Sequence, residues 1–304
     1  MNPLQKLAIA VRAPFFTGIA IPIIFGSTLA YYDTGVFNWL VFFVTLLGGI
    51  FAHAAANMTN DYYDHKTTDD VVNKNFTPFS GGSRAIQNGL LTPGQTITIA
   101  SVFWILALSC GAYLTVVTPG YWVIYLAIAG FIGGYFYTAS KFAFAYNRIG
   151  EIMILICFGI LPIMGSYYTQ AGAFSALSFW ASFPIGFLIT AILYINQYPD
   201  YEADKSVGKN HLVATMGKDK ARGGYYFLIF GNYLAIVLAV LFAGLTPWAL
   251  VALLSLPIAL KTVKTFARQY DKIKELIPAQ AGTIQVHLLT GLLMSAGVVA
   301  GALL

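Results

Sequence analysis

Charged residues are scarce in this sequence. Only 10% of its 304 residues are Asp, Glu, Lys or Arg, whereas 58% are hydrophobic, and the mean hydropathy is +0.71. Because a soluble domain carries about 25% charged residues, this composition excludes an ordinary soluble fold. It predicts an all-α polytopic membrane protein in which residues 1–304 form a single transmembrane domain.

The sequence has only two cysteines and no recognisable cofactor motif. Cys110 and Cys157 both lie in apolar runs, so we expect them to pack as small hydrophobic residues rather than to form a disulfide. His53 and His287 are likewise surrounded by apolar residues, and we expect them to make interhelical hydrogen bonds. The sequence has no zinc-binding His/Cys spacing, no Walker A motif and no dinucleotide fingerprint.

Long apolar runs predict nine transmembrane helices. Each run approaches the roughly 20 apolar residues that a membrane-spanning helix needs. The runs cover about residues 14–32, 37–59, 95–117, 121–139, 150–169, 177–198, 224–243, 246–264 and 283–303.

The basic residues indicate how these helices are oriented. All 17 Lys and Arg residues lie on one side, whereas the opposite loops, around 33–36, 118–121, 170–176 and 244–246, contain none. The positive-inside rule therefore predicts a cytoplasmic N-terminus in the cell (inner) membrane. It also places two Asp-rich loops, about 60–93 and 199–223, in the cytoplasm. Topology explains the net charge of +5, so nucleic-acid binding is not expected.

Acidic residues are concentrated in two segments that follow apolar runs. Each segment begins with Asn and has Asp four residues later, as in Asn60 and Asp64 or Asn196 and Asp200. Residues four apart share a helix face, and clustered carboxylates repel one another unless a cation joins them. The segments predict a Mg²⁺ site shared with a phosphate-bearing substrate, although a solvated helix end is an alternative for the first. Their acidic residues are Asp61, Asp64, Asp69, Asp70, Asp200, Glu202 and Asp204.

Other residues near these segments suit a phosphate. Gly81 and Gly82 free the backbone to approach an anion, and Arg84 can hold a phosphate bidentately; an ordinary turn is the alternative. Lys209 can contact the same phosphate or simply set the topology. Pro199 is expected to bend or end its helix, which would turn the second group of carboxylates toward a common centre.

At these residues the chain resembles the UbiA superfamily of intramembrane aromatic prenyltransferases. The two Asp-rich motifs of that family, NDxxDxxxD and DxxxD, and its YxxxK element all have counterparts here. The nine-helix layout with an inside N-terminus also fits the family. The matching residues are Asn60, Asp61, Asp64, Asp200, Asp204, Tyr137 and Lys141.

One departure from the family pattern indicates a branch. Thr68, not Asp, stands four residues after Asp64, and carboxylates follow at Asp69 and Asp70. This arrangement resembles the branch that prenylates 1,4-dihydroxy-2-naphthoate in menaquinone synthesis.

The resemblance implies a mechanism. Two Mg²⁺ ions would join the diphosphate of a polyprenyl diphosphate to the protein, and an aromatic acceptor would take the polyprenyl group. The tail would lie in an apolar cleft open to the bilayer, with the active site on the cytoplasmic side. Arg84, Lys141 and Lys209 would bind diphosphate, and Tyr137 would donate a hydrogen bond. The implied catalytic residues are Asp64, Asp200, Asp204, Tyr137 and Lys141, and the implied metal ligands are Asn60, Asp61, Asp64, Asn196, Asp200 and Asp204.

Two alternatives remain open. An enzyme of the same family can use another acceptor, such as 4-hydroxybenzoate, homogentisate, chlorophyllide, haem or a glyceryl phosphate lipid, because the shape of the pocket decides this choice. A cation-coupled transporter would also use membrane-edge acids, but it is expected to place them near mid-bilayer rather than at one face.

Overall fold

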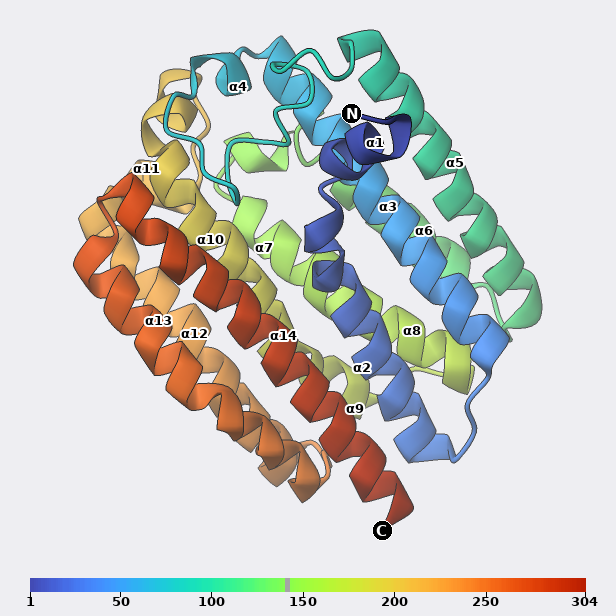
Figure 1. Ribbon diagram of the computed structural model, residues 1–304. Helices are drawn as coiled ribbons and strands as arrows, with labels where there is room; N and C mark the ends of the chain where they lie inside the picture. Colours follow the sequence, from blue (N-terminus) through green and yellow to red (C-terminus); the bar gives the residue numbers. More distant parts are fainter. Residues whose placement is uncertain (140–142) are drawn as a thin grey trace.

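The computed structural model describes residues 1–139 and 143–304, and within these ranges the chain is helical and has no strand. Long helices lie side by side in a bundle, and the short helices α1, α4 and α11 gather at one end (Figure 1). The N-terminus lies at this end and the C-terminus at the other. The short helices are α1 (Pro3–Ala10), α4 (Asp69–Val72) and α11 (Leu212–Met216).

Eight helical segments of the described chain are long and apolar enough to cross a membrane. Each coincides with one of the predicted apolar runs. Several segments join shorter helices end to end. They are Ala13–Thr34 (η1, Ala13–Phe16, and α2, Thr17–Thr34), α3 (Trp39–Lys66), α5 (Pro93–Val117), Gly150–Ala171 (α7, Gly150–Ile154; η3, Leu155–Ile160; α8, Leu161–Ala171), Ala176–Ser206 (α9, Ala176–Trp180, and α10, Ser182–Ser206), α12 (Lys218–Phe242), Pro247–Gln269 (η4, Pro247–Ser255, and α13, Leu256–Gln269) and α14 (Ile273–Leu303).

The remaining predicted run, 121–139, forms the shorter helix α6 (Trp122–Tyr135), which is followed after the undescribed residues by η2 (Phe144–Tyr146). At 1.5 Å per residue its 14 residues extend about 21 Å, less than the roughly 30 Å hydrocarbon core. The prediction of an all-α polytopic membrane protein is confirmed. The count of nine spans, the cytoplasmic N-terminus and the single domain stay predictions.

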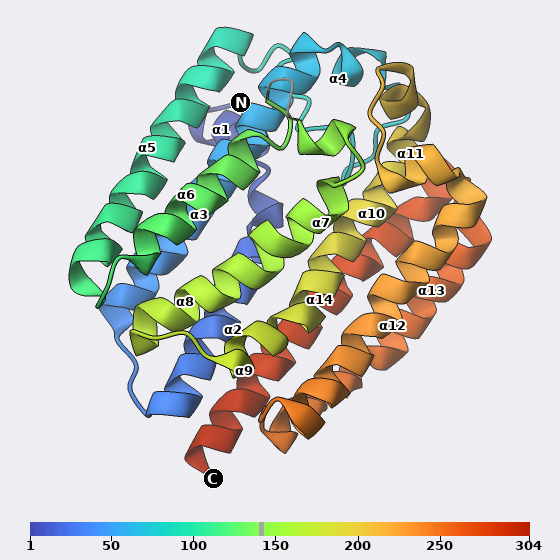
Figure 2. The same cartoon turned by 180° about the vertical axis from the view of Figure 1, so that it is seen from behind.

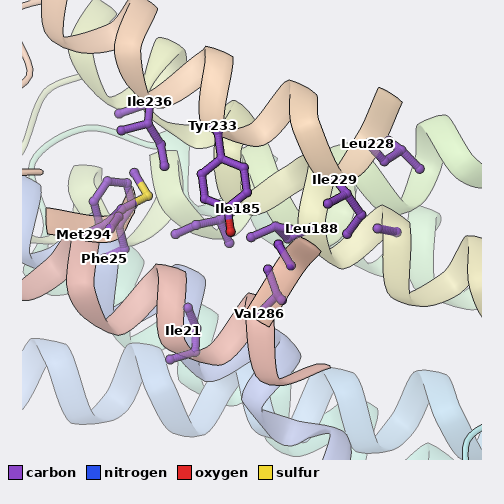
Figure 3. Close-up of a cluster of buried hydrophobic side chains, with 14 of the residues drawn as sticks. Ile21, Phe25, Ile185, Leu188, Leu228, Ile229, Tyr233, Ile236, Val286 and Met294 are labelled. Atoms are coloured by element: carbon purple, nitrogen blue, oxygen red, sulfur yellow. The ribbon is translucent and has the colours of Figure 1, made fainter. Parts of the chain in front are cut away.

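Helix α10 lies at the centre of the largest hydrophobic core. Its side chains Ile185 and Leu188 are fully buried among residues of α2, α12 and α14, and Figure 3 shows Phe25, Ile229 and Met294 from these helices around them. From behind, α10 is seen beside α12 (Figure 2). Burial on several sides makes α10 a rigid support for the residues at its end.

A pair of glycines brings α10 close to the π-helical segment η3. A Cβ added to Gly159 would lie 2.5 Å from the Cα of Gly186, so neither position has room for a side chain. Small residues permit such close backbone approach inside membranes, where packing drives helix association. This contact holds the middle of the α7–α8 segment against the first part of α10, the end of the helix opposite to its aspartates.

The two acidic segments are helical where the sequence predicts loops or a helix end. Helix α3 continues to Lys66, and α10 continues through Pro199 to Ser206. The predicted loops therefore start too early, and of the two outcomes expected at Pro199, a bend or an end of the helix, the end does not occur. This matters for the site, because the aspartates are held by the helical backbone at the ends of α3 and α10 and not by a loop.

Candidate active site

The ends of α3 and α10 meet at one cavity, which we call the acidic cavity. Its volume is about 680 Å³, and both acidic segments line it. The prediction that the two segments converge is therefore consistent with the geometry. Its acidic and amide-bearing lining residues are Asn60, Asp64, Asp69, Asp70, Asn73, Asn196, Gln197, Asp200 and Asp204.

The ammonium of Lys209 lies among carboxylates from both segments. Its Nζ donates to Oδ2 of Asp64 at 2.8 Å, contacts Oδ2 of Asp69, and lies 3.7 Å from Oδ1 of Asp204. Burial alone would lower the pKa of Lys209, but these three carboxylates outweigh burial and raise the pKa well above its usual value. Lys209 is therefore a buried charged group of the site, and not a solvated lysine.

His211 holds Asp204 in place, although sequence reasoning did not select it. The backbone N–H of Ala214 donates to Nδ1 of His211 at 3.1 Å, so Nε2 carries the proton and donates to Oδ2 of Asp204 at 2.9 Å. Burial lowers the pKa of His211 to about 4, which keeps the ring neutral. The only sequence signal was its position just after Lys209.

The loop after α4 folds over two of the aspartates. Asn73 donates to Oδ1 of Asp200 at 2.7 Å, and the backbone N–H of Gly81 donates to Oδ2 at 3.0 Å. The backbone N–H of Ser83 donates to Oδ1 of Asp61 at 3.1 Å, and its hydroxyl donates to the other oxygen. The backbone N–H groups of Gly81 and Ser83 are thus hydrogen-bonded to carboxylates of the protein itself.

Gly82 fits this loop because it lacks a side chain. Its φ is +73°, in the left-handed region, and a Cβ there would lie 2.6 Å from Oδ2 of Asp70. Burial, followed by the charges of Asp64 and Asp61, raises the pKa of Asp70 to about 9. Among the described residues that line the acidic cavity, the acidic side chains outnumber the basic ones, Arg12 and Lys209.

The remaining predicted residues are placed differently. Arg84 does not line the acidic cavity: it donates to the backbone carbonyl of Asp70 and its guanidinium lies 4.5 Å from the ring centroid of Phe76. Asp61 is buried outside the lining, bonded to Ser83. Lys141 lies outside the described residues, so its predicted role stays a prediction.

Tyr137 and Asn196 do line the acidic cavity. Burial raises the pKa of Tyr137, and the nearby charge of Glu151 raises it further, so its hydroxyl keeps its proton. Oδ1 of Asn196 accepts a hydrogen bond from Gln280 of α14 at 2.9 Å. A protonated phenol and an oriented amide are thus available at the same wall.

Sequence reasoning did not select two more charged residues, one that lines the acidic cavity and one that is bonded to a lining residue. Arg12 lines the acidic cavity, donates to the carbonyl of Phe79 at 2.9 Å and has a φ of +54°, so the turn before η1 presents it inward. Glu151 of α7 is buried, and its Oε1 accepts hydrogen bonds from Gln197 and from the backbone of Leu212, each at 2.9 Å. In the sequence Arg12 resembles a topology-setting residue, and Glu151 is an isolated acid.

The residues of the acidic cavity fit a hard divalent cation. Oδ1 of Asp64 and Oδ1 of Asp69 are buried without a hydrogen-bond partner among the described residues. Across residues 1–139 and 143–304, no three His, Cys, Asp or Glu side chains form a ready metal cluster. Mg²⁺ commonly takes one or two carboxylates and completes its shell with substrate phosphates and water, so the unpartnered oxygens of Asp64 and Asp69 are suited to it. Lys209 supplies the positive charge between these carboxylates here.

Two further cavities continue from the acidic cavity. The middle cavity, about 970 Å³, shares Asn60, Tyr137 and Asn196 with it. The apolar cavity, about 1070 Å³, lies beyond and is lined mainly by hydrophobic residues of α2, α3, α5, α6 and the α7–α8 segment. A polar head and a long apolar tail can therefore be bound along one continuous path.

Comparison with known proteins identifies relatives of this chain. A sequence model of the UbiA prenyltransferase family matches residues 19–277. The chain is 27% identical to the 1,4-dihydroxy-2-naphthoate octaprenyltransferase of Bacillus subtilis, over 94% of this chain and 89% of that protein. It is 29% identical to the Escherichia coli protein of the same name, over 91% and 89%. A solved structure of a UbiA homolog from Archaeoglobus fulgidus bound to GPP and Mg²⁺ has a TM-score of 0.66 at 17% identity, covering 95% of this chain and 99% of that one.

Proposed function

Because this chain belongs to the UbiA prenyltransferase family, we propose that it transfers a polyprenyl group from polyprenyl diphosphate to 1,4-dihydroxy-2-naphthoate in a Mg²⁺-dependent reaction. The chain is an integral membrane protein and a prenyltransferase. The acceptor is proposed from the two bacterial relatives, whose names specify it. The observation that carries the proposal is the convergence of Asp64, Asp69 and Asp204 on one buried ammonium.

The acidic cavity is suited to the diphosphate. Asp64, Asp200 and Asp204, with Asn60 and Asn196, would hold Mg²⁺, which would neutralise the charge of the leaving diphosphate. Asp61 is a more distant candidate ligand. Their side chains come from the ends of the packed helices α3 and α10, so the backbone that carries them is already in place when substrate binds.

Positive side chains of the protein would stabilise the departing group. Lys209 can exchange its carboxylate contacts for phosphate oxygens, and Arg12 lines the same cavity. Tyr137 can donate its phenolic proton in a hydrogen bond, since burial keeps it protonated. Lys141 and Arg84 are proposed to add charge, Arg84 only after it leaves its present contact with Asp70.

The reaction replaces one bond with another. The C–O bond between the prenyl chain and the diphosphate breaks, and a ring carbon of the acceptor forms a C–C bond with the same prenyl carbon. With 1,4-dihydroxy-2-naphthoate, the carboxyl group leaves as CO₂. The loop at Gly81–Ser83 covers the carboxylates, and it would help exclude water that competes for the allylic cation.

The distribution of basic residues supports the proposal that this chemistry occurs on the cytoplasmic side of the cell membrane. Both acidic segments end at the side where the sequence gathers Lys and Arg, and the positive-inside rule assigns that side to the cytoplasm. The acids lie on the last turns of α3 and α10 rather than along the helices, which does not favour a transporter.

An assay with defined substrates tests the proposal. Purified protein in lipid vesicles receives Mg²⁺, one polyprenyl diphosphate and, in separate reactions, 1,4-dihydroxy-2-naphthoate, 4-hydroxybenzoate or homogentisate. Mass spectrometry should detect a decarboxylated, prenylated naphthalene as the main product. Faster prenylation of another acceptor would contradict the proposed substrate while leaving the prenyltransferase assignment intact.

A further inference from the structure

His53 lies where the middle cavity meets the apolar cavity. The acidic and middle cavities share Arg12, Asn60, Tyr137, Leu193 and Asn196, whereas the middle and apolar cavities share His53, Ala56, Gly134, Cys157 and Phe158. The three cavities are therefore in series, and His53 marks the second boundary. Along α3 it lies two turns, roughly 10 Å, before Asn60 at the first boundary.

The imidazole of His53 has an unusual environment. Its side chain is 8% exposed, its ring centroid lies 4.9 Å from that of Phe158 and 5.6 Å from that of Phe16, and Nδ1 has no hydrogen-bond partner among the described residues. The interhelical hydrogen bond that its sequence context predicts is not formed at this nitrogen. An unpaired buried nitrogen loses its hydration without compensation. Because Nδ1 has almost no accessible surface, the nitrogen of His53 that a ligand in the cavity can reach is Nε2, on the other edge of the ring.

An unpaired nitrogen is not by itself a binding site, as His287 of α14 shows. His287 is fully buried, and neither of its ring nitrogens has a partner within the described ranges. It lines none of the three cavities. What distinguishes His53 is that its ring lines two connected cavities, and this makes His287 a matched control.

We propose that His53 binds a hydroxyl group of the aromatic acceptor in the middle cavity; this inference rests on the function proposed above. With diphosphate in the acidic cavity, the first prenyl carbon must lie near the boundary marked by Asn60 and Asn196. The attacking ring must touch that carbon, so it shares the middle cavity with the first part of the prenyl chain, which continues to the apolar cavity. Its opposite end then reaches toward His53.

The chemistry of imidazole suits this contact. A neutral histidine has one ring nitrogen that accepts and one that donates, so it can accept the O–H of a ring hydroxyl. The bond would orient the ring and increase its electron density for attack on the allylic carbon. His53 would also discriminate against ring ethers, because a site built to bind a hydroxyl rejects analogues that lack it.

Kinetics of three variants test the inference. His53→Leu removes both nitrogens, His53→Gln keeps an acceptor and a donor, and His287→Leu removes the control imidazole. Each is assayed with 1,4-dihydroxy-2-naphthoate and its 4-O-methyl ether at saturating donor, and the KM for polyprenyl diphosphate is measured separately. If His53→Leu does not fold, His53→Phe replaces it.

We expect His53→Leu to lower kcat/KM for the dihydroxy acceptor about 10- to 100-fold and to abolish the preference over the ether. His53→Gln should keep that preference, and His287→Leu and the donor KM should change little. An unchanged preference in His53→Leu, or an effect on the donor KM alone, would overturn the inference. Failure of the proposed function would appear in the wild type instead, as no transfer to the hydroxylated naphthoate, and it would remove this inference with it.

Discussion

Nζ of Lys209 lies 2.8 Å from Oδ2 of Asp64, although 145 positions separate the two residues in the chain. This contact joins the end of α3 to the loop that follows α10. It shows how the protein balances charge at a site rich in carboxylates. We expect substrate and cation binding to rearrange the contact, because Asp64 is also a proposed metal ligand.

Replacing the aspartates of α10 should abolish transfer. Asp200→Asn and Asp204→Asn keep the shape of the side chains but remove negative charge, so each should lower kcat/KM at least about 100-fold through weaker metal binding. Glu202→Gln is the matched control, because Glu202 lies on the same helix and is exposed. Initial rates of product formation measure the effect, and wild-type rates in either Asn variant would exclude that residue from the site.

Asp64 of α3 should be equally necessary. Asp64→Ala should abolish turnover while the protein remains inserted in the membrane and folded, because the change removes a ligand without disturbing the hydrophobic core. Product formation and thermal unfolding are measured on the same preparation. Normal turnover by Asp64→Ala would remove the first acidic segment from the mechanism.

Lys209 should stabilise the metal-free protein. Lys209→Met leaves Asp64, Asp69 and Asp204 without their shared cation, and loss of one partner from a buried ion pair costs about 3–5 kcal/mol. The melting temperature in EDTA should fall, and Mg²⁺ should restore part of it. Lys205→Met is the control, because Lys205 is exposed. Equal melting temperatures for the two variants would show that the buried contacts contribute no net stability.

Gly82→Ala should damage the loop over the carboxylates. Gly82 and Gly89 both have positive φ, and an L-residue there costs about 1–2 kcal/mol. Only at Gly82 would the new Cβ meet a carboxylate, 2.6 Å from Asp70, whereas nothing lies within 4 Å at Gly89. Gly82→Ala should therefore lower both melting temperature and transfer rate more than Gly89→Ala. Similar values for both variants would mean that the close approach has no consequence.

The pKa of Asp70 predicts a pH dependence of stability. Burial, and then the charges of Asp64 and Asp61, raises this pKa from 3.8 to about 9. Between these values the folded protein holds a proton that the unfolded chain has released, so stability is greatest below the lower pKa and falls as pH rises toward the upper one. Melting temperatures in EDTA should decline over this range, and Asp70→Asn should flatten the decline. An equally steep decline in that variant would assign it to other groups.

Local composition was sufficient to predict the helical membrane architecture. Apolar runs and the one-sided distribution of Lys and Arg are properties of neighbouring residues, and burial in lipid depends on them directly. The repeated Asn-to-Asp spacing identified Asp64 and Asp200 in the same way, because helix geometry makes residues four apart neighbours before any tertiary contact forms.

Tertiary packing alone decided which charges meet. Helix α10 continues past Pro199 to Asp204, and Lys209 lies among three carboxylates. His211 contacts Asp204. Arg12 lines the acidic cavity, whereas Arg84 does not. The contacts of Lys209 with Asp64 and Asp69 join residues about 140 positions apart in the chain, and their strength depends on burial and distance. Neither quantity is encoded in the spacing of residues along a single segment, so the sequence pointed to the acids while the fold selected their partners.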